Sequence, residues 1–226
     1  MQIKVLLLAL TLIATSLAAD PVPKPWPKVW RANFTEHLYH KATGHTVTKG
    51  NWFYNFETEQ LKTIRYNGAG DELCGTTSGY KNNTVCETTV TKGNRYLYFP
   101  ESKFCCRCCS VEDGCGTVRP DWFVTGKYLG KLKDSGFVVN KWDKRGGQNN
   151  YVSQIAEGKY KGVTLRVFQD PQSNLQYDPT TVRQDVDNRV FNLPVGRGCE
   201  KACPKPSKCA EIRGSSLKKV RDLVEE

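Results

Sequence analysis

The sequence predicts a mainly β protein with minor α content: a curved antiparallel sheet or half-barrel with one or two short helices, stapled by disulfides. Short runs rich in Val, Tyr, Phe and Trp recur along the chain, with breaks rich in Gly, Asn and Lys between them. That spacing is typical of neighbouring antiparallel strands, and no long helical periodicity separates the runs. The 226 residues include ten cysteines, and an even number favours a disulfide framework.

The N-terminus, residues 1–19, has the layout of a secretory signal peptide. Lys4 precedes an apolar run from Val5 to Ala14, and small residues follow up to Ala19. The run is shorter than the roughly 20 residues that span a bilayer, and no later segment is a transmembrane candidate. We therefore expect a protein that is secreted and extracellular, or that lies in a lumenal compartment of the secretory pathway. Such oxidising compartments favour cystines over free thiols.

A proline-rich stretch, residues 20–43, is expected to be an extended N-terminal arm, because each proline removes a backbone donor and disfavours helix in the residue before it. The β domain is expected to cover residues 44–212. Its strand-like segments are two runs on either side of "ETEQ" within residues 48–68, then "NRYLYFP", "GFVVNKW", "NNYVSQI" and "GVTLRVFQD".

Two segments have helical character. The first is "DPTTVRQDVDN", where Asp178 or Thr180 can cap the N-terminus. The second lies in the C-terminal segment, residues 213–226, which places Leu217, Val220 and Leu223 on one face. A packed helix and a frayed tail are both open for that last segment.

The cysteines form a central cluster and two flanking groups. The expected disulfide residues are Cys74, Cys86, Cys105, Cys106, Cys108, Cys109, Cys115, Cys199, Cys203 and Cys209. The central doublets also have the C-x2-C spacing of zinc sites, but the secretory context and the even count favour cystines. Adjacent cysteines rarely bond to each other, so each doublet should reach two partners. The first two cysteines can close a local loop, and the last three can pin the tail to the central cluster.

Several function classes find no support in the residues. His37, His40 and His45 fall within nine residues of "NFTEHLYHKATGHTV", which has the character of a loop that enters a strand. Polar surface is therefore a better interpretation of these histidines than a metal site. No G-x-S-x-G elbow, P-loop or H-E-x-x-H motif occurs, so we expect no enzyme, no catalytic residues and no dedicated metal ligands. The formal net charge is +10, but the basic residues are dispersed among acidic ones, which argues against a nucleic-acid partner.

Two N-glycosylation sequons fit the secretory prediction. They are Asn33-Phe34-Thr35 and Asn82-Asn83-Thr84. The second lies in "SGYKNNTVC", which has the composition of an exposed turn. We therefore expect Asn33 and Asn82 as candidate glycosylation sites of a glycoprotein.

Four segments, taken in order, resemble the ependymin-related protein family. "GNWFYNFETEQLKTIRY" is similar to the family's aromatic hairpin, with Asn55 where the family has Asp. The others are "RPDWFVTGKYLG", "SGFVVNKW" with "NNYVSQI", and "YDPTTVRQDVDNRVFNLPVGRGC". Together they cover about two thirds of the chain. The clustered cysteines depart from the family pattern and suggest a distant, cysteine-rich branch.

The resemblance implies a LolA-like fold, a strongly curved antiparallel sheet with helices near its concave face. It also implies a secreted or lysosomal glycoprotein that binds lipids or other hydrophobic molecules in a deep apolar pocket. Homodimers and bound calcium are further properties that the resemblance implies. No other cofactor is expected.

Strand alternation supplies candidate pocket residues on the inner face of such a sheet. They are Tyr54, Phe56, Tyr66, Tyr98, Phe137, Val139, Trp142, Tyr151, Leu165 and Val167. Our expectation is a secreted protein that binds a hydrophobic small molecule or lipid in this concavity. Two alternatives stay open. The residues can form a packed core, and the protein can be an extracellular structural or adhesion protein that binds a protein, glycan or matrix partner without a small ligand.

Overall fold

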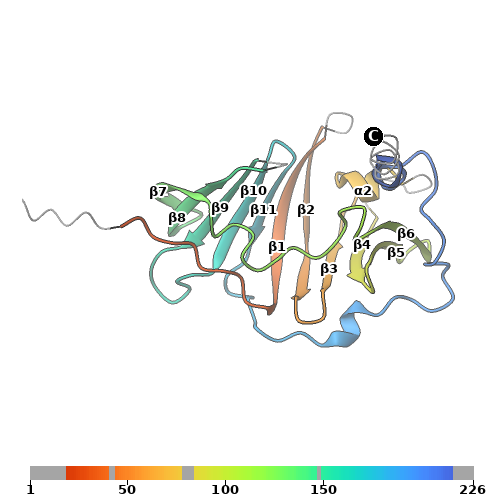
Figure 1. Cartoon of the computed structure of the whole chain (residues 1–226), viewed down its shortest axis with the longest axis horizontal. Helices are drawn as coiled ribbons and strands as arrows, with labels where there is room; N and C mark the ends of the chain where they lie inside the picture. Colours follow the sequence, from red (N-terminus) through yellow and green to blue (C-terminus); the bar gives the residue numbers. More distant parts are fainter. Residues whose placement is uncertain (1–18, 41–43, 78–83, 147–148, 216–226) are drawn as a thin grey trace, which may run out of the picture.

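The fold is a single open, curved antiparallel sheet of eleven strands (Figure 1). The computed structural model describes residues 19–40, 44–77, 84–146 and 149–215. The strands are β1 (Val29–His40), β2 (Gly44–Asn55), β3 (Gln60–Arg65), β4 (Cys86–Thr91), β5 (Asn94–Phe99), β6 (Phe104–Ser110), β7 (Lys127–Asp134), β8 (Phe137–Lys144), β9 (Asn149–Ile155), β10 (Thr164–Asp170) and β11 (Ser173–Tyr177). Two short helices accompany them, α2 (Glu72–Gly75) and the 3-10 turn η1 (Asn188–Phe191).

The strand order is β6-β5-β4-β3-β2-β1-β11-β10-β9-β8-β7, so β1 lies in the middle of the sheet. The chain starts there and winds outward through hairpins to the edge strand β6. Residues 111–126 then cross to the opposite edge, and the chain winds inward from β7 to β11, which pairs with β1. The mainly β class with short helices is therefore confirmed.

Strand β1 corrects one expectation. The sequence suggested that the extended arm runs to residue 43 and that "NFTEHLYH" belongs to a loop, but the arm ends at Lys28 and a twelve-residue strand begins at Val29. The physical reason is alternation: Trp30 and Phe34 are buried, whereas Arg31 and Asn33 are exposed. Period-two burial, together with pairing on both sides of the strand, holds it in the centre of the sheet.

The expected helix in residues 178–188 is also wrong. This segment is irregular, and its backbone pairs with the start of β1, because Arg31 and Arg183 exchange two N–H···O=C bonds of 2.8 and 3.0 Å. Asp178 caps a turn, accepting from the backbone N of Thr180 at 2.9 Å. The short η1 begins only at Asn188. Backbone pairing with a central strand therefore overrides the weak local helix preference.

Two segments of the chain pack over one face of the sheet, which we call the covered face. They are the arm, residues 20–28, and the crossing segment, residues 117–124. A hydrogen bond links them, because the Trp26 N donates to the Pro120 carbonyl at 3.0 Å. The opposite face, which we call the open face, carries Asn33, His37 and Lys49. Alternation along each strand assigns neighbouring side chains to opposite faces.

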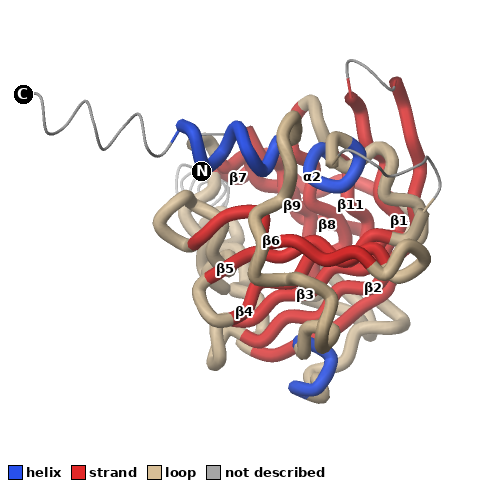
Figure 2. The backbone as a smooth tube through the Cα atoms, turned by 90° about the vertical axis from the view of Figure 1, so that its right-hand side faces the viewer, coloured by secondary structure: helices blue, strands red, loops and turns tan. Residues whose placement is uncertain are grey.

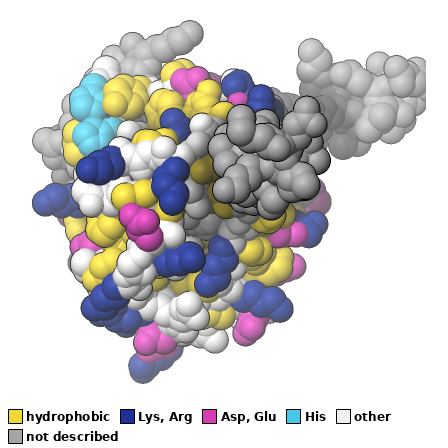
Figure 3. Space-filling view, turned by 90° about the vertical axis from the view of Figure 1, so that its left-hand side faces the viewer, with side chains coloured by type: hydrophobic (Ala, Val, Ile, Leu, Met, Phe, Trp, Pro, Cys, Tyr) yellow, Lys and Arg dark blue, Asp and Glu magenta, His cyan; other side chains and the backbone are white. Residues whose placement is uncertain are grey.

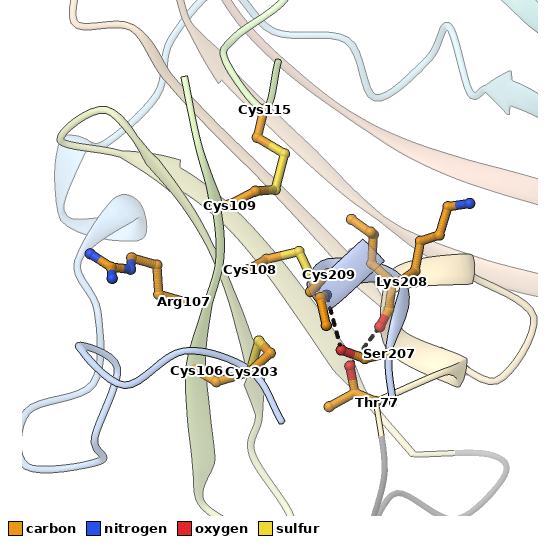
Figure 4. Close-up of a disulfide and its surroundings, with 12 residues drawn as sticks. Thr77, Cys106, Arg107, Cys108, Cys109, Cys115, Cys203, Ser207, Lys208 and Cys209 are labelled. Atoms are coloured by element: carbon orange, nitrogen blue, oxygen red, sulfur yellow. Dashed lines mark hydrogen bonds between the residues drawn. A yellow bond between two sulfur atoms is a disulfide. The ribbon is translucent and has the colours of Figure 1, made fainter. Parts of the chain in front are cut away.

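All ten cysteines are paired, and the doublets reach different partners as expected. The bonds are Cys74–Cys86, Cys105–Cys199, Cys106–Cys203, Cys108–Cys209 and Cys109–Cys115. Figure 4 shows three of them around β6. The central doublets lie on β6, where alternation directs Cys105 and Cys106 to opposite faces of the sheet. At Cys108 and Cys109 the pairing with β5 shifts by one residue, and both side chains are buried in one cluster.

The C-terminal segment protects the β6 edge. The Arg107 N donates to the Lys201 carbonyl at 2.7 Å, and the Cys203 N donates to the Arg107 carbonyl at 2.9 Å. The chain turns helical at residues 208–215, beside α2 (Figure 2), where the Lys208 N donates to Thr76 Oγ1 at 2.9 Å. The expected C-terminal helix or tail therefore begins at 208, and residues 216–226 lie outside the described part of the chain. A covered edge cannot pair with another chain.

Candidate ligand-binding site

A cluster of aromatic rings fills the covered face, and we call it the aromatic basin. Alternation on β1 and β2 sets Trp30 opposite Tyr54 on one face, and β11 adds Tyr177 opposite Phe34. Rings from the covering chain complete it. The basin consists of Trp26, Trp30, Trp52, Tyr54, Trp122, Phe123 and Tyr177.

Trp26, from the N-terminal arm, occupies the middle of the basin. Its ring centroid lies 5.4–6.1 Å from those of the five rings Trp30, Trp52, Tyr54, Trp122 and Phe123. Its indole Nε1 donates to Thr164 Oγ1 at 3.0 Å. Edge-to-face contacts of this kind are favourable beyond the area that they bury. The arm is therefore anchored by one deeply inserted indole.

The basin leaves several buried hydrogen-bond donors unpaired. Within the described part of the chain, the indole Nε1 of Trp30, Trp52 and Trp122 and the hydroxyl of Tyr177 have no partner. Trp30, Trp52 and Tyr177 are 3%, 8% and 1% exposed, and their centroids lie 5.1–6.0 Å apart. A buried unpaired donor typically costs about 1–3 kcal/mol, and buried Trp and Tyr usually find acceptors. The basin therefore lacks hydrogen-bond acceptors for these four donors.

The phenols of the basin stay protonated at neutral pH. Burial, reinforced by the Asp121 carboxylate, raises the pKa of Tyr54, whose hydroxyl donates to the Val118 carbonyl at 2.7 Å. Burial and the nearby Glu36 carboxylate raise the pKa of Tyr177 well above its ordinary value, and Arg65 opposes them. The Tyr177 hydroxyl is therefore a neutral donor.

A buried charge cluster lies next to Tyr177 on the covered face. Arg65 Nε lies 2.7 Å from Glu36 Oε2, and Arg65 Nη1 lies 3.4 Å from Asp71 Oδ2. Burial lowers the pKa of Arg65, but the Asp71 and Glu36 carboxylates outweigh it and raise the pKa. Ser173 Oγ also donates to Glu36 at 2.6 Å. The carboxylate of Glu36 is thus satisfied inside the protein.

The hollow beside Trp26 is small. It has a volume of about 130 Å³ and lies between the arm and the loop before β10, with Trp30, Lys161 and Val182 in its walls. Ligand pockets usually measure about 300–1,000 Å³. In this structure the basin is therefore closed, and its own side chains occupy it.

The ten predicted pocket residues do not form one pocket. Tyr54 belongs to the basin, Phe56 and Val167 pack against it, and Trp142 is buried on the same face, where its Nε1 donates to the Pro21 carbonyl at 3.1 Å. The others lie away from it. Val139, Leu165 and Phe137 share a small core of the β8–β10 wing, Tyr66 is exposed, and Tyr98 and Tyr151 are half-buried.

Sequence reasoning missed the tryptophans of the basin. Trp26 and Trp30 both lie in residues 20–43, which were expected to be an extended arm, and Trp52 lies two residues before Tyr54. The alternation of Trp30, Ala32 and Phe34 was a signal that could have found β1 and its inner face.

Two of the three histidines form a pair on the open face. His37 Nδ1 lies 3.1 Å from His45 Nε2, and the Tyr39 ring stacks on His45 at 4.9 Å. Figure 3 shows histidine side chains at one corner of the molecule, with hydrophobic side chains beside them. Among the described residues, no group of three or more His, Cys, Asp or Glu side chains is placed to hold a metal ion.

The two glycosylation candidates differ in what the structure shows. Asn33 is exposed on the open face, and its Oδ1 accepts from Asn51 Nδ2 at 2.8 Å. Asn82 lies outside the described residues. Modification of either asparagine stays a prediction. None of the described helices has the length and apolarity needed to cross a membrane.

Comparison with known proteins gives structural likeness alone. No protein-family model matches the chain, and no curated protein matches it. An uncharacterized conserved protein from Thermus thermophilus is similar in structure at 8% identity and a TM-score of 0.46, over 77% of this chain and 91% of that one. A LolA superfamily protein from Nitrosomonas europaea is similar at 8% identity and a TM-score of 0.36, over 76% and 93%. Likeness at these levels says nothing of function, and membership of the ependymin-related family stays a prediction.

Proposed function

We propose that this is a secreted, non-catalytic binding protein that takes an apolar small molecule or lipid into the aromatic basin. The observation that carries the proposal is the set of unpaired donors on Trp30, Trp52, Trp122 and Tyr177. Donors buried among aromatic rings need acceptors. An apolar ligand that bears carbonyl, ether or hydroxyl oxygens would supply them.

Trp26 is the internal occupant that such a ligand would replace. The indole fills the space between the rings but has only a donor, which it gives to Thr164. It therefore leaves the donors of Trp30 and Trp52 unsatisfied. A flat ligand that resembles the indole ring but carries acceptors would gain about 1 kcal/mol or more of binding free energy for each donor that it pairs.

The arm is held by contacts that a ligand can compete with. Lys24 exchanges two hydrogen bonds with the Gln154 side chain, of 2.9 and 2.6 Å, and the Phe56 N donates to the Lys28 carbonyl at 2.8 Å. No disulfide ties residues 20–28 to the sheet. Removing Trp26 from the basin therefore breaks no covalent link.

The basin also favours an uncharged ligand. Its unpaired groups are indole N–H groups and a neutral phenol, and the neighbouring charges Glu36, Arg65 and Asp71 already neutralise one another in part. An unpaired carboxylate in this apolar setting would be costly. This proposal requires no cofactor, and calcium and homodimers stay implications of the family resemblance.

The first test is extraction of the native protein. Secreted protein purified without detergent is extracted with organic solvent, and the extract is analysed by mass spectrometry. We expect an apolar molecule with at least one oxygen acceptor, absent from an unrelated disulfide-bonded protein secreted and purified in parallel. Empty extracts at good protein yield, or the same molecules in both extracts, would count against the proposal.

A second candidate, adhesion through a glycan partner, is favoured by a different observation on the open face. Two hollows lined by both aromatic and polar side chains lie there, and Trp26 lines neither of them.

A further inference from the structure

The open face is hollowed at two adjacent places. One hollow, of about 530 Å³, lies over β2, β1 and β11 and includes Asn33, Asn51 and Gln176; we call it the amide hollow. The other, of about 640 Å³, lies over β9, β10 and β11 and includes Lys141, Tyr151 and Phe168; we call it the basic hollow.

Arg166 forms the ridge between the two hollows. It lines the basic hollow, and its Nη2 donates to Gln176 Oε1, in the amide hollow, at 2.9 Å. Its Nη1 donates to Asn174 Oδ1 at 2.7 Å, and both Nε and Nη2 lie 2.7 Å from the Asp134 carboxylate. This pairing, opposed in part by burial, lowers the pKa of Asp134. Asp134 is therefore ionised at neutral pH, and Arg166 neutralises it.

The basic hollow combines an aromatic floor with unpaired cations. The Tyr151 and Phe168 rings stack at 6.0 Å with an interplanar angle of 18°. Lys141 Nζ lies 4.8 Å from the Tyr151 centroid. Neither Lys141 nor Lys133, which also lines the hollow, forms an ion pair with any described residue. Since Arg166 already neutralises Asp134, the hollow has an excess of positive charge.

The amide hollow presents hydrogen-bonding groups in a row. The Tyr66 hydroxyl donates to Asn51 Oδ1 at 2.5 Å, and Asn51 Nδ2 donates to Asn33 Oδ1 at 2.8 Å. Tyr66 itself is 52% exposed, and Lys49 and Thr180 also line the hollow. Fixed amides beside an exposed ring suit a ligand that has many hydroxyl groups and an apolar face.

We propose that the two hollows together bind an acidic oligosaccharide. Sugar rings would pack on Tyr66 and on the Tyr151–Phe168 pair, their hydroxyls would bond to the amides, and a sulfate or carboxylate would lie near Lys133 and Lys141. The seven adjacent strands from β2 to β7, where Lys133 lies, span roughly 29 Å at the usual strand spacing. That length suits several linked sugars better than a single one.

The charge and the lining together favour a saccharide over other anionic partners. The amide hollow has apolar side chains such as Phe137 and Leu165 in its lining, and beside them a row of hydrogen-bonded amides and a tyrosine hydroxyl. A sugar has both an apolar face and hydroxyl groups, so it matches this mixed lining better than a lipid chain does. The basic residues of the chain are dispersed among acidic ones and do not form the continuous stripe that binds a nucleic-acid backbone. Tighter binding to a lipid surface or to a nucleic acid is therefore a result that would contradict the proposal.

The test is calorimetric titration of the full disulfide-bonded protein with a heparin-derived hexasaccharide, in about 50 mM NaCl so that surface charges are little screened. Uncharged chitohexaose is the matched ligand. We expect binding of the acidic hexasaccharide that weakens as salt is added. Replacing both lysines, K133Q with K141Q, should weaken binding about tenfold or more, as expected for lost charge-assisted hydrogen bonds.

The control is K92Q, which removes one exposed charge at the β4–β5 turn, outside both hollows. It should bind as the wild type does, while Y66S should weaken binding without changing the salt dependence. No binding of the acidic hexasaccharide, equal binding of chitohexaose, an equal loss in K92Q, or tighter binding of anionic vesicles or single-stranded DNA would each overturn the proposal. Since Trp26 does not line either hollow, W26A should leave this binding unchanged, which separates it from the basin.

Discussion

Replacing the cysteines of all three long-range bonds, Cys105–Cys199, Cys106–Cys203 and Cys108–Cys209, by alanine is expected to lower the free energy of unfolding by at least about 4–5 kcal/mol. These bonds join residues 94, 97 and 101 apart in sequence. Any one of them keeps the long loop between β6 and the C-terminal segment closed, so in the chain-entropy account only the loss of all three frees that loop in the unfolded state. Their loss also frees the segment after Cys203, whose Arg213 guanidinium donates to the carbonyls of Cys108 and Cys203. Guanidinium-induced unfolding measures the change.

The chain contains a matched control in Cys109–Cys115. These residues neighbour the same strand end but are only six apart, so removing this bond should cost about 2 kcal/mol. A loss for the three long-range bonds no larger than the loss for Cys109–Cys115 would contradict the account of the C-terminal segment as a long-range clamp. All ten cysteines are paired with one another, so a chelator should leave the unfolding curve of the oxidised protein unchanged.

Replacing Arg65 by methionine is expected to destabilise the protein by about 3–5 kcal/mol, as when one partner of a buried ion pair is removed. Glu36 is 3% exposed, and without Arg65 its carboxylate would be left buried with only the Ser173 hydroxyl as a partner. Thermal and denaturant unfolding at pH 7 measure the loss.

The exposed pair Arg189–Asp187 provides the matched control. Its side chains are 86% and 55% exposed although the atoms lie 2.5 Å apart, so R189M should leave the free energy of unfolding close to that of the wild type. Adding E36Q to R65M should recover part of the loss, because an amide does not leave a buried charge. A loss below about 1 kcal/mol in R65M would show that Glu36 is solvated.

Those parts of the fold that depend on short stretches of sequence could be predicted from the sequence alone. Alternating runs predicted β2, β3, β5, β8, β9 and β10, and the cysteine count predicted a fully paired framework. The sequence also indicated that each doublet reaches two partners, and the structure shows that it does. Local periodicity and covalent chemistry are properties of short segments, which one sequence shows directly.

The aromatic basin could not be predicted in the same way, because it depends on contacts between segments that lie far apart in the sequence. Trp26 reaches the basin only because the arm lies across the sheet and meets Pro120 in the crossing segment. The proline-rich composition predicted an extended arm but not the part of the sheet on which it packs. The pocket residues also divided between separate clusters, because alternation fixes which neighbours share a face but not which face is covered.

The central claim is that the basin is a site for an apolar ligand with acceptors, and that Trp26 occupies the place of its ring. The most direct measurement is calorimetric titration of W26A with coumarin and with naphthalene, two flat bicyclic molecules of which only coumarin carries acceptors. F99A, which opens a cavity in the separate disulfide-rich core, is the control, and engineered apolar cavities do bind small aromatic molecules.

We expect W26A to bind coumarin about tenfold more tightly than naphthalene, since one recovered buried hydrogen bond is worth about 1–1.5 kcal/mol. F99A should show no such preference for coumarin. Failure of W26A to bind either molecule, or binding of naphthalene as tightly as coumarin, would contradict the claim that the unpaired donors of the basin await a ligand.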